Sequence, residues 1–287
     1  MTGRLPPDGL LYDPEVTTQE EIDAFRDFYV RTKGYSLPAF EFWLEFRPDV
    51  LKRYRANFVR ETTSAEEKPR PLAHVMAMLH YYAVIGFEDG IIYEVKLAEN
   101  HGATRGEIMD TLAFAFIHGN PLGMRGVAIS SMEYLKTSRP PPARDGRWPE
   151  AWSFDANALR SGIDFSTADP TQRDMDALTD WYRTTIGEVP RYVRFLARYR
   201  PGFLKAYRNR FEHALRDGLP KQMVPYLLLN FNVMRGFRDG IREAVLLGRW
   251  LGLTRPQLVD AICWAYFGGM DAISIADEAA GDILDAM

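Results

Sequence analysis

Four residues in the first half of the chain have side chains suited to acid–base chemistry: His80, Glu88, Glu94 and His118. On a helical wheel with roughly 100° per residue, Glu94 falls inside the apolar arc of segment 87–100, and Glu88 lies at its flank. Removing a carboxyl group from water raises its pKa toward neutrality, where it can donate or accept a proton. We therefore predict Glu88, Glu94 and His118 as catalytic residues.

Structural explanations compete with these roles. Six residues separate the two glutamates, so they stand roughly 120° and 9 Å apart on a helix and do not share a proton. The alternative for Glu88 is an ion pair with the arginine stripe of the second half, which begins at Arg238. The alternative for His118 is a cation at a helix C-terminus, where the helix dipole favours positive charge.

Three residues are predicted to bind a substrate: His80, Tyr82 and Arg125. Arg125 has the planar guanidinium that binds a carboxylate with two hydrogen bonds, although a solvated arginine is the simpler alternative. His80 and Tyr82 lie near the end of a predicted helix, where aromatic side chains more often belong to the core. The acid–base residues follow no known metal-ligand spacing, so we expect no metal site and no cofactor, with metal-dependent chemistry as a weaker alternative.

The elements that would position these residues occur twice. Residues 86–91 (GFEDGI) recur as residues 236–241 (GFRDGI) at a shift of 150, and farther upstream Lys52 recurs as Lys205 at a shift of 153. The pattern predicts helix after helix and no confident strand, so we expect an all-α fold of two tandem repeats packed with pseudo-two-fold symmetry. The predicted domains are an extended lead (1–16), repeat one (17–136), a Pro-rich linker (137–168) and repeat two (169–287).

Repeat two does not keep the candidate residues of repeat one. At a shift of 150, His80, Glu88, Glu94 and His118 become Asn230, Arg238, Ala244 and Gly268. A shared core residue would usually persist in both copies, whereas a catalytic residue need be present only once. This asymmetry favours repeat one as the active half and repeat two as the degenerate half, although neutral drift produces the same pattern.

Capping signals predict where helices begin. In a capping box, a Thr side chain and a polar side chain three residues later satisfy the first backbone amides of a helix. Such pairs start at Thr18, Thr104 and Thr254. In repeat one, helices are expected over residues 71–85 and 87–100.

Composition limits the classes of function. The net charge of −4 disfavours a general role in nucleic-acid binding. The single cysteine, Cys263, excludes an internal disulfide and a cysteine metal cluster, and its apolar neighbours predict a buried thiol. The N-terminal residues lack the apolar core of a signal peptide, and no apolar run approaches the roughly 20 residues of a membrane helix. We expect no membrane partner and a cytoplasmic location.

One spacing in repeat one resembles that of a known family. The pattern is Gly86-x-Glu88-x5-Glu94-x3-Ala98-x-Asn100-x-Gly102-x-Thr104-x2-Glu107-Ile108, followed by Gly119-x-Pro121. It resembles the carboxymuconolactone decarboxylase family, which belongs to the alkylhydroperoxidase-like (AhpD-like) superfamily. The resemblance implies an all-helical fold whose single-domain members form dimers that build hexamers. Two fused copies would replace one such dimer, so a homo-oligomer, and a trimer in particular, is expected.

The functional residues of the family are only partly present. The decarboxylase motif resembles Gly-x-Glu-His with a second histidine farther along the helix, whereas Asp89 and Glu94 stand at the two histidine positions here. The redox Cys-x-x-Cys of the peroxidase branch is absent, which excludes thiol peroxidase chemistry.

We therefore predict a cofactor-independent lyase or isomerase that acts on a small organic acid or lactone by proton transfer. Whether the chain is an enzyme stays open at this point. The alternative is a non-catalytic oligomeric scaffold or ligand-binding protein that has lost the family chemistry.

Overall fold

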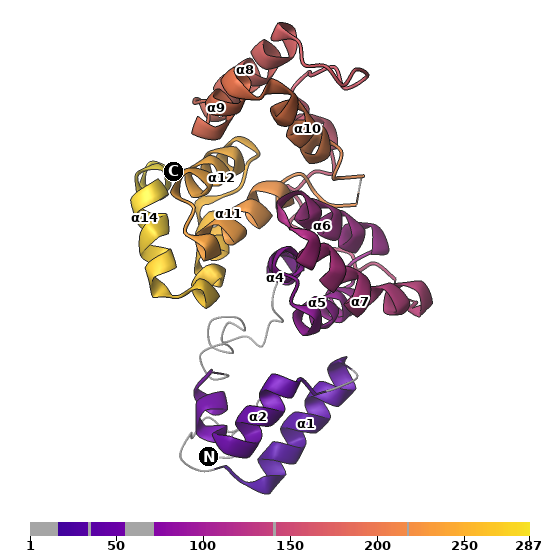
Figure 1. The fold of residues 1–287 in the computed structure, drawn as a ribbon. Coiled ribbons are helices and arrows are strands. Elements are labelled where there is room, and N and C mark those ends of the chain that lie inside the picture. Colours follow the sequence, from indigo (N-terminus) through magenta and orange to yellow (C-terminus); the bar gives the residue numbers. More distant parts are fainter. Residues whose placement is uncertain (1–16, 34–35, 55–71, 140–141, 217) are drawn as a thin grey trace. The chain divides into compact units, whose positions relative to one another are not determined.

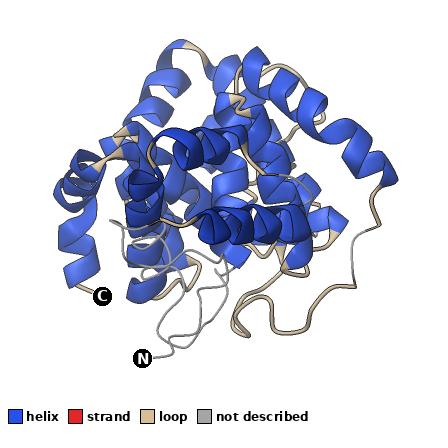
Figure 2. Ribbon diagram, turned by 90° about the horizontal axis from the view of Figure 1, so that it is seen from below, coloured by secondary structure: helices blue, strands red, loops and turns tan. Residues whose placement is uncertain are grey.

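The structure is a computed structural model, and it describes residues 17–33, 36–54, 72–139, 142–216 and 218–287. Every regular element in these residues is helical, which confirms the predicted all-α class (Figure 2). The chain divides into two compact units, residues 1–71 and 72–287, and we describe each unit by itself. None of the described helices is long and apolar enough to cross a membrane. The predicted lead, residues 1–16, lies outside the described residues.

The first unit contains α1 (Gln19–Lys33), α2 (Pro38–Phe46) and a helical stretch over residues 48–54. The capping box predicted at Thr18 is present, because the Thr18 side chain accepts a hydrogen bond from the Glu21 amide and Glu21 accepts one from Thr18. Glu21 also forms a buried ion pair with Lys52, at 2.9 Å. One carboxylate therefore both begins α1 and ties it to the stretch 48–54.

The second unit is built around two helices that pack against each other, α4 (Leu72–Ile85) and α11 (Met223–Arg235) (Figure 1). Three elements contact α4, namely α5 (Glu88–Asn100), α6 (Arg105–His118) and α7 (Pro121–Thr137). The partners of α11 are α12 (Arg238–Trp250), α13 (Arg255–Cys263), η2 (Trp264–Gly268) and α14 (Met270–Asp285). The central helices are buried almost throughout, so the core of the unit lies around them.

These contacts correspond between the two halves of the sequence. The pairs α4–α5, α4–α6 and α5–α7 match the pairs α11–α12, α11–α13 and α12–α14. The capping boxes predicted at Thr104 and Thr254 both form, at the equivalent helices α6 and α13. The correspondence supports a duplication, while the two-fold axis stays a prediction.

The turns that begin α5 and α12 need glycine. Gly86 and Gly236 have φ angles of +76° and +65°, in the left-handed region that side chains disfavour. A Cβ atom at Gly86 would also lie 2.7 Å from the backbone oxygen of Leu122. Gly86 and Gly236 therefore allow the sharp turns after which α5 packs against α4 and α12 packs against α11.

Three more helices complete the second unit: α8 (Gln172–Ile186), α9 (Arg191–Tyr199) and α10 (Pro201–Glu212). α8 packs against α12, α9 against α10, and α10 against α6. A buried ion pair between Lys205 and Asp174, at 3.0 Å, ties α10 to the first turn of α8. This pair repeats the Lys52–Glu21 pair of the first unit at the shift of 153.

The segment between the halves is anchored by aromatic side chains. Trp148 and Trp152 are both buried and stack at 5.7 Å between ring centroids. Trp148 donates a 2.5 Å hydrogen bond to Glu107 on α6. The prediction of a buried thiol was wrong, because Cys263 is exposed at the end of α13.

Candidate functional site

Glu94 is buried, as the helical wheel predicted. Its exposed fraction is 2%, and Ile91, Val95 and Ala98 beside it on α5 are fully buried. The wheel was less accurate at the start of the helix, since Phe87 is 46% exposed. The catalytic role of Glu94 stays a prediction.

Glu88 lies on the surface in a local ion pair. Its Oε1 atom is 3.1 Å from Nη1 of Arg125 on α7, and both side chains are largely exposed. Arg238, the expected alternative partner, instead pairs with Glu278 on α14. The proposed pairing of Glu88 with the arginine stripe of the second half is therefore wrong. Two of the predicted site residues, Glu88 and Arg125, are therefore in contact, but only with each other and at the surface.

His80 and His118 come together in the interior, with their ring centroids 5.9 Å apart. His80 is fully buried, and among the described residues neither ring nitrogen has a hydrogen-bond partner. Burial lowers the pKa of His80 well below its usual value, and the nearby His118 acts in the same direction. Burial also lowers the pKa of His118 to about 4. Both rings are neutral at pH 7.

His118 lines a cavity of about 540 Å³, whose other walls come from the second half of the sequence. The lining residues are His118, Tyr192, Tyr207, Leu228, Phe231, Asn232, Gly236, Phe237, Arg238, Asp239, Gly240 and Glu243. Of the six predicted site residues, only His118 contributes to this cavity. Tyr82 packs instead against Phe87, with ring centroids 5.3 Å apart.

Glu243, in the second turn of α12, lines this cavity and has a raised pKa. Burial raises its pKa to about 7, although the hydroxyl groups of Tyr182 and Tyr192 and the charge of Arg208 lower it. A carboxyl group with this pKa is present in both protonation states at neutral pH. Such a group is suited to general acid or base catalysis.

Two tyrosines form a hydrogen-bonded chain that ends at Glu243. The Tyr192 hydroxyl donates to Glu243 Oε1 at 3.2 Å, and the hydroxyl oxygens of Tyr182 and Tyr192 are 2.6 Å apart. Because the Tyr192 hydrogen is directed to Glu243, Tyr182 must donate to Tyr192. Burial raises the pKa of both tyrosines well above the usual value, so both hydroxyls keep their protons.

A buried cation lies behind this chain. Arg208 is fully buried, forms an ion pair with Glu212 at 2.9 Å, and donates to the carbonyl oxygen of Leu159 at 3.0 Å. Its guanidinium carbon lies 4.5 Å from the ring centroid of Trp181 and 5.7 Å from that of Tyr182. The cation fixes the tyrosine ring and favours the charged form of Glu243.

Glu243 also lines a smaller hollow of about 250 Å³. Three arginines contribute to it, Arg191, Arg194 and Arg242, together with Glu188, Val189, Pro190 and Asp239. Arg191 lies 3.8 Å from Asp239, and Arg242 lies 3.3 Å from Glu188. Glu243 therefore has an aromatic cavity and a cationic hollow beside it.

Glycine at the start of α12 allows this close packing. A Cβ atom added to Gly240 would lie 2.7 Å from the side-chain amide of Asn232. At the same place in repeat one, a Cβ atom at Gly90 would lie 2.7 Å from the ring of Tyr82. The smaller Asn232 in repeat two replaces a tyrosine ring and adds polar atoms to the cavity wall.

Comparison of the two repeats did not identify Glu243, because it considered only the acid–base residues of repeat one that are absent from repeat two. At the shift of 150, Glu243 stands where repeat one has Tyr93, so an acid appears in the copy regarded as degenerate. A comparison that starts from the acid–base residues of repeat two and finds their replacements in repeat one identifies this glutamate. No pattern in the sequence, however, placed Tyr182 and Tyr192 beside this helix.

Among the described residues, no three His, Cys, Asp or Glu side chains gather in a way that could hold a metal ion. The chemistry that these residues offer is proton transfer between Glu243, neutral His118 and a bound molecule.

Comparison with known proteins gives a likeness of fold. No family model matches the chain, and no curated protein matches its sequence. A solved structure from Burkholderia xenovorans LB400, described as a "putative gamma-carboxymuconolactone decarboxylase subunit", is similar with a TM-score of 0.54 and 16% sequence identity. The similarity covers 91% of this chain and 97% of that chain. The protein thus shares the all-α fold of that structure.

Proposed function

We propose that the protein is a cofactor-independent enzyme that transfers a proton to or from a small organic acid or lactone, with Glu243 as the acid–base group. The observation that carries the proposal is the pKa of Glu243, which burial raises to about 7 in a cavity of about 540 Å³. A cavity of this size suits a small organic molecule. The fold-level likeness to a decarboxylase subunit supports the same class of reaction.

Decarboxylation is the reaction that we favour. The bond between the substrate carbon and its carboxylate breaks, CO₂ leaves, and the electron pair is delocalised into an adjacent carbonyl as an enolate. Protonated Glu243 then returns a proton to carbon. Tyr192 orients the carboxyl group through its hydrogen bond, and neutral His118 lies in the same cavity to bind the substrate.

The surroundings of Glu243 suit an acidic substrate. The hollow beside it is lined by Arg191, Arg194 and Arg242, which carry three positive charges against the carboxylates of Glu188 and Asp239. Residues at the N-terminus of α12 also line the main cavity, where the helix dipole favours an anion. We infer that the carboxylate of the substrate is held on this side and the lactone or keto group on the aromatic side.

The proposed site needs both halves of the sequence. His118 belongs to the predicted repeat one (17–136), whereas Tyr192 and Glu243 belong to repeat two (169–287). We therefore propose that the two repeats build one site together, rather than one active half and one degenerate half. Glu94 and Glu88, the earlier candidates, do not line the cavity.

The test is a comparison of the wild type with Glu243→Gln on a panel of γ-lactone carboxylates and 3-oxo acids, with CO₂ release and product NMR as readouts. If Glu243 acts as the acid, wild-type kcat falls as the pH rises through about 7, because the proton is lost. The variant loses this pH dependence and about 10²- to 10⁴-fold of the rate.

Glu133→Gln is the matched control, since Glu133 is an exposed carboxylate on α7 outside the cavity. Its rate and pH profile should equal those of the wild type. Full turnover by Glu243→Gln would overturn the assignment. Saturable binding of panel compounds without turnover would favour the alternative, a ligand-binding protein that has lost the family chemistry.

A further inference from the structure

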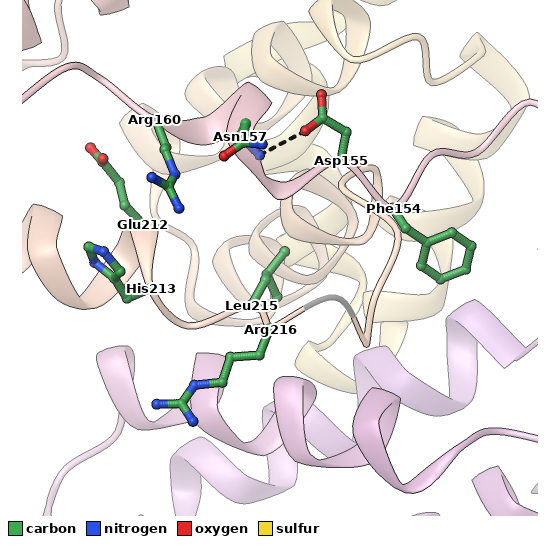
Figure 3. A pocket seen from close by; sticks show the side chains of 8 residues that line it. All are labelled: Phe154, Asp155, Asn157, Arg160, Glu212, His213, Leu215 and Arg216. Carbon is green, nitrogen blue, oxygen red and sulfur yellow. Dashed lines mark hydrogen bonds between the residues drawn. The ribbon is translucent and has the colours of Figure 1, made fainter.

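A second large cavity, of about 560 Å³, lies between the linker and the end of α10 (Figure 3). Its lining residues are Phe154, Asp155, Asn157, Arg160, Glu212, His213, Leu215 and Arg216. None of them lines the cavity of Glu243. We propose that this cavity is a separate binding site for a small organic anion that carries a phosphate or carboxylate group.

Two arginines supply the charge for this site. Arg160 follows the short helix η1 (Ala156–Leu159), and Arg216 follows α10, so the two come from segments far apart in the sequence. In the described part of the chain, neither side chain has a hydrogen bond or an ion pair. In Figure 3, Arg160 extends from its segment toward the one that carries His213 and Arg216. A guanidinium group without a carboxylate partner keeps its donors for a ligand.

The carboxylates in the lining do not cancel this charge. Glu212 is buried and forms an ion pair with the fully buried Arg208 at 2.9 Å, so its charge is already balanced. Asp155 accepts a hydrogen bond from the Asn157 amide at 3.0 Å, which caps η1. The lining therefore contains two arginines, Arg160 and Arg216, against one carboxylate, Asp155, that has a structural partner, and the site favours an anion.

Both segments are held in place by buried groups. On one side, the Ser161 amide donates to Glu212 at 3.2 Å, directly after Arg160. On the other side, the Arg216 amide donates to Asp110 on α6 at 3.0 Å, and the amides of Gly218 and Leu219 donate to the same oxygen. The backbone of each arginine is thus fixed before a ligand arrives, which reduces the entropy lost on binding.

The remaining lining residues suit an organic ligand. His213 donates from Nδ1 to the Asn209 carbonyl oxygen at 2.8 Å, because a carbonyl can only accept. Its Nε2 atom is then the ring nitrogen left for a ligand. Phe154, 41% exposed, and buried Leu215 provide apolar surface beside the cations. A small molecule with an anionic group and some carbon skeleton meets both kinds of lining.

Calorimetric titration of the full-length protein with inorganic phosphate and with citrate tests the proposal. Wild-type protein should bind at least one probe saturably, and Arg160→Gln and Arg216→Gln should each bind it at least tenfold more weakly. Binding of phosphate alone would identify a phosphate-bearing ligand, and binding of citrate alone a carboxylate-bearing ligand. Binding of both would show that the site recognises the charge common to them.

Two controls make the test specific. Arg173→Gln removes the same charge from an exposed position on α8 and should bind like the wild type. Glu243→Gln should also bind like the wild type, which separates this site from the proposed catalytic cavity. The proposal is overturned if neither probe binds the wild type, or if Arg160→Gln and Arg216→Gln bind as tightly as Arg173→Gln. Equal unfolding temperatures of all variants would show that lost binding is not lost folding.

Discussion

At the scale of single residues, the chemical character of Glu243 comes from its surroundings. Burial raises its pKa, while the tyrosine hydroxyls and Arg208 lower it, and the balance falls at about 7. Each lowering contribution comes from a named side chain, so each of these can be removed separately by mutation. Two predictions follow from this balance at the residue scale.

Stability should depend on pH through Glu243. Its folded-state pKa of about 7 lies above the usual 4.5, so the folded protein holds this proton more tightly than the unfolded chain. The resulting stabilisation is complete below pH 4.5 and is lost as the pH rises through 7. Relative to Glu243→Gln, the wild type should therefore lose up to about 3 kcal/mol of unfolding free energy between roughly pH 5 and pH 8. Urea unfolding of both proteins across this range measures the loss, and a constant difference would contradict it.

Tyr192→Phe should raise the pKa of Glu243 further. The substitution removes the 3.2 Å hydrogen bond to Oε1, which stabilises the carboxylate more than the neutral acid. The midpoint of the pH–rate profile should move upward by roughly one unit. Tyr199→Phe, on the exposed face of α9, is the control and should leave the midpoint unchanged. A midpoint that stays in place or moves downward in Tyr192→Phe would argue against the hydrogen-bonded chain.

The sequence predicted the environment of a residue well where that environment depends on nearby positions in the chain, and poorly where it depends on distant elements. The burial of Glu94 follows from its position on the apolar arc of its own helix. The properties of Glu243 depend on tyrosines from α8 and α9, which only the tertiary fold brings to α12. Helical periodicity carries no information about such distant neighbours.

At the scale of elements, buried ion pairs connect segments that lie far apart in the sequence. Lys205 on α10 pairs with Asp174 on α8, and its Nζ atom also donates to the Asp169 carbonyl and to Thr167. Although burial alone would raise the pKa of Asp174, hydrogen bonds from Thr171, Lys205 and Asp164 lower it well below its usual value. The pair therefore holds the start of α8, the helix that carries Tyr182.

Lys205→Met should be strongly destabilising. It leaves the Asp174 carboxylate buried without its cation, a change that typically costs about 3–5 kcal/mol. Urea unfolding should show this loss as a lower midpoint with an unchanged slope. Lys136→Met removes an exposed lysine from α7 and should change the unfolding free energy by less than about 0.5 kcal/mol. Equal effects of the two substitutions would show that the buried pair contributes little.

Helix boundaries were largely predictable because their causes lie within a few residues. The predicted helices 71–85 and 87–100 appear as Leu72–Ile85 and Glu88–Asn100, and all three predicted capping boxes form. Which helices would pack together was not predictable from the same signals. The placement of α8 against α12 depends on matching surfaces that no local motif describes.

At the scale of the whole molecule, one helix face is unusually apolar for an exposed surface. Leu122, Ile129 and Met132 on α7 are 64%, 55% and 52% exposed, and their spacing places them on the same side of the helix. Contiguous apolar surface of this kind often marks an association site. Association of copies of this chain, with a trimer favoured, stays a prediction, and this face is a candidate interface for it.

Light scattering after size-exclusion chromatography tests the assembly. Three chains of 32.9 kDa give roughly 99 kDa for a trimer. Ile129→Asp should reduce the mass to that of smaller species, because burying an unpaired carboxylate in an apolar interface is costly. Glu133→Asp, on the same helix, serves as the control and should keep the wild-type mass. A wild-type mass of a single chain would refute the predicted assembly.

The cavity that holds both His118 and Glu243 also bears on how a duplicated chain can evolve. While each copy of a fused pair keeps a complete site, mutations can inactivate either copy and the other copy keeps the activity. In the proposed site, one copy supplies the imidazole and the other the carboxyl group, so neither copy could be lost. A gene that began with a redundant second half would then have made its two halves mutually dependent, and deletion of either would remove the whole activity.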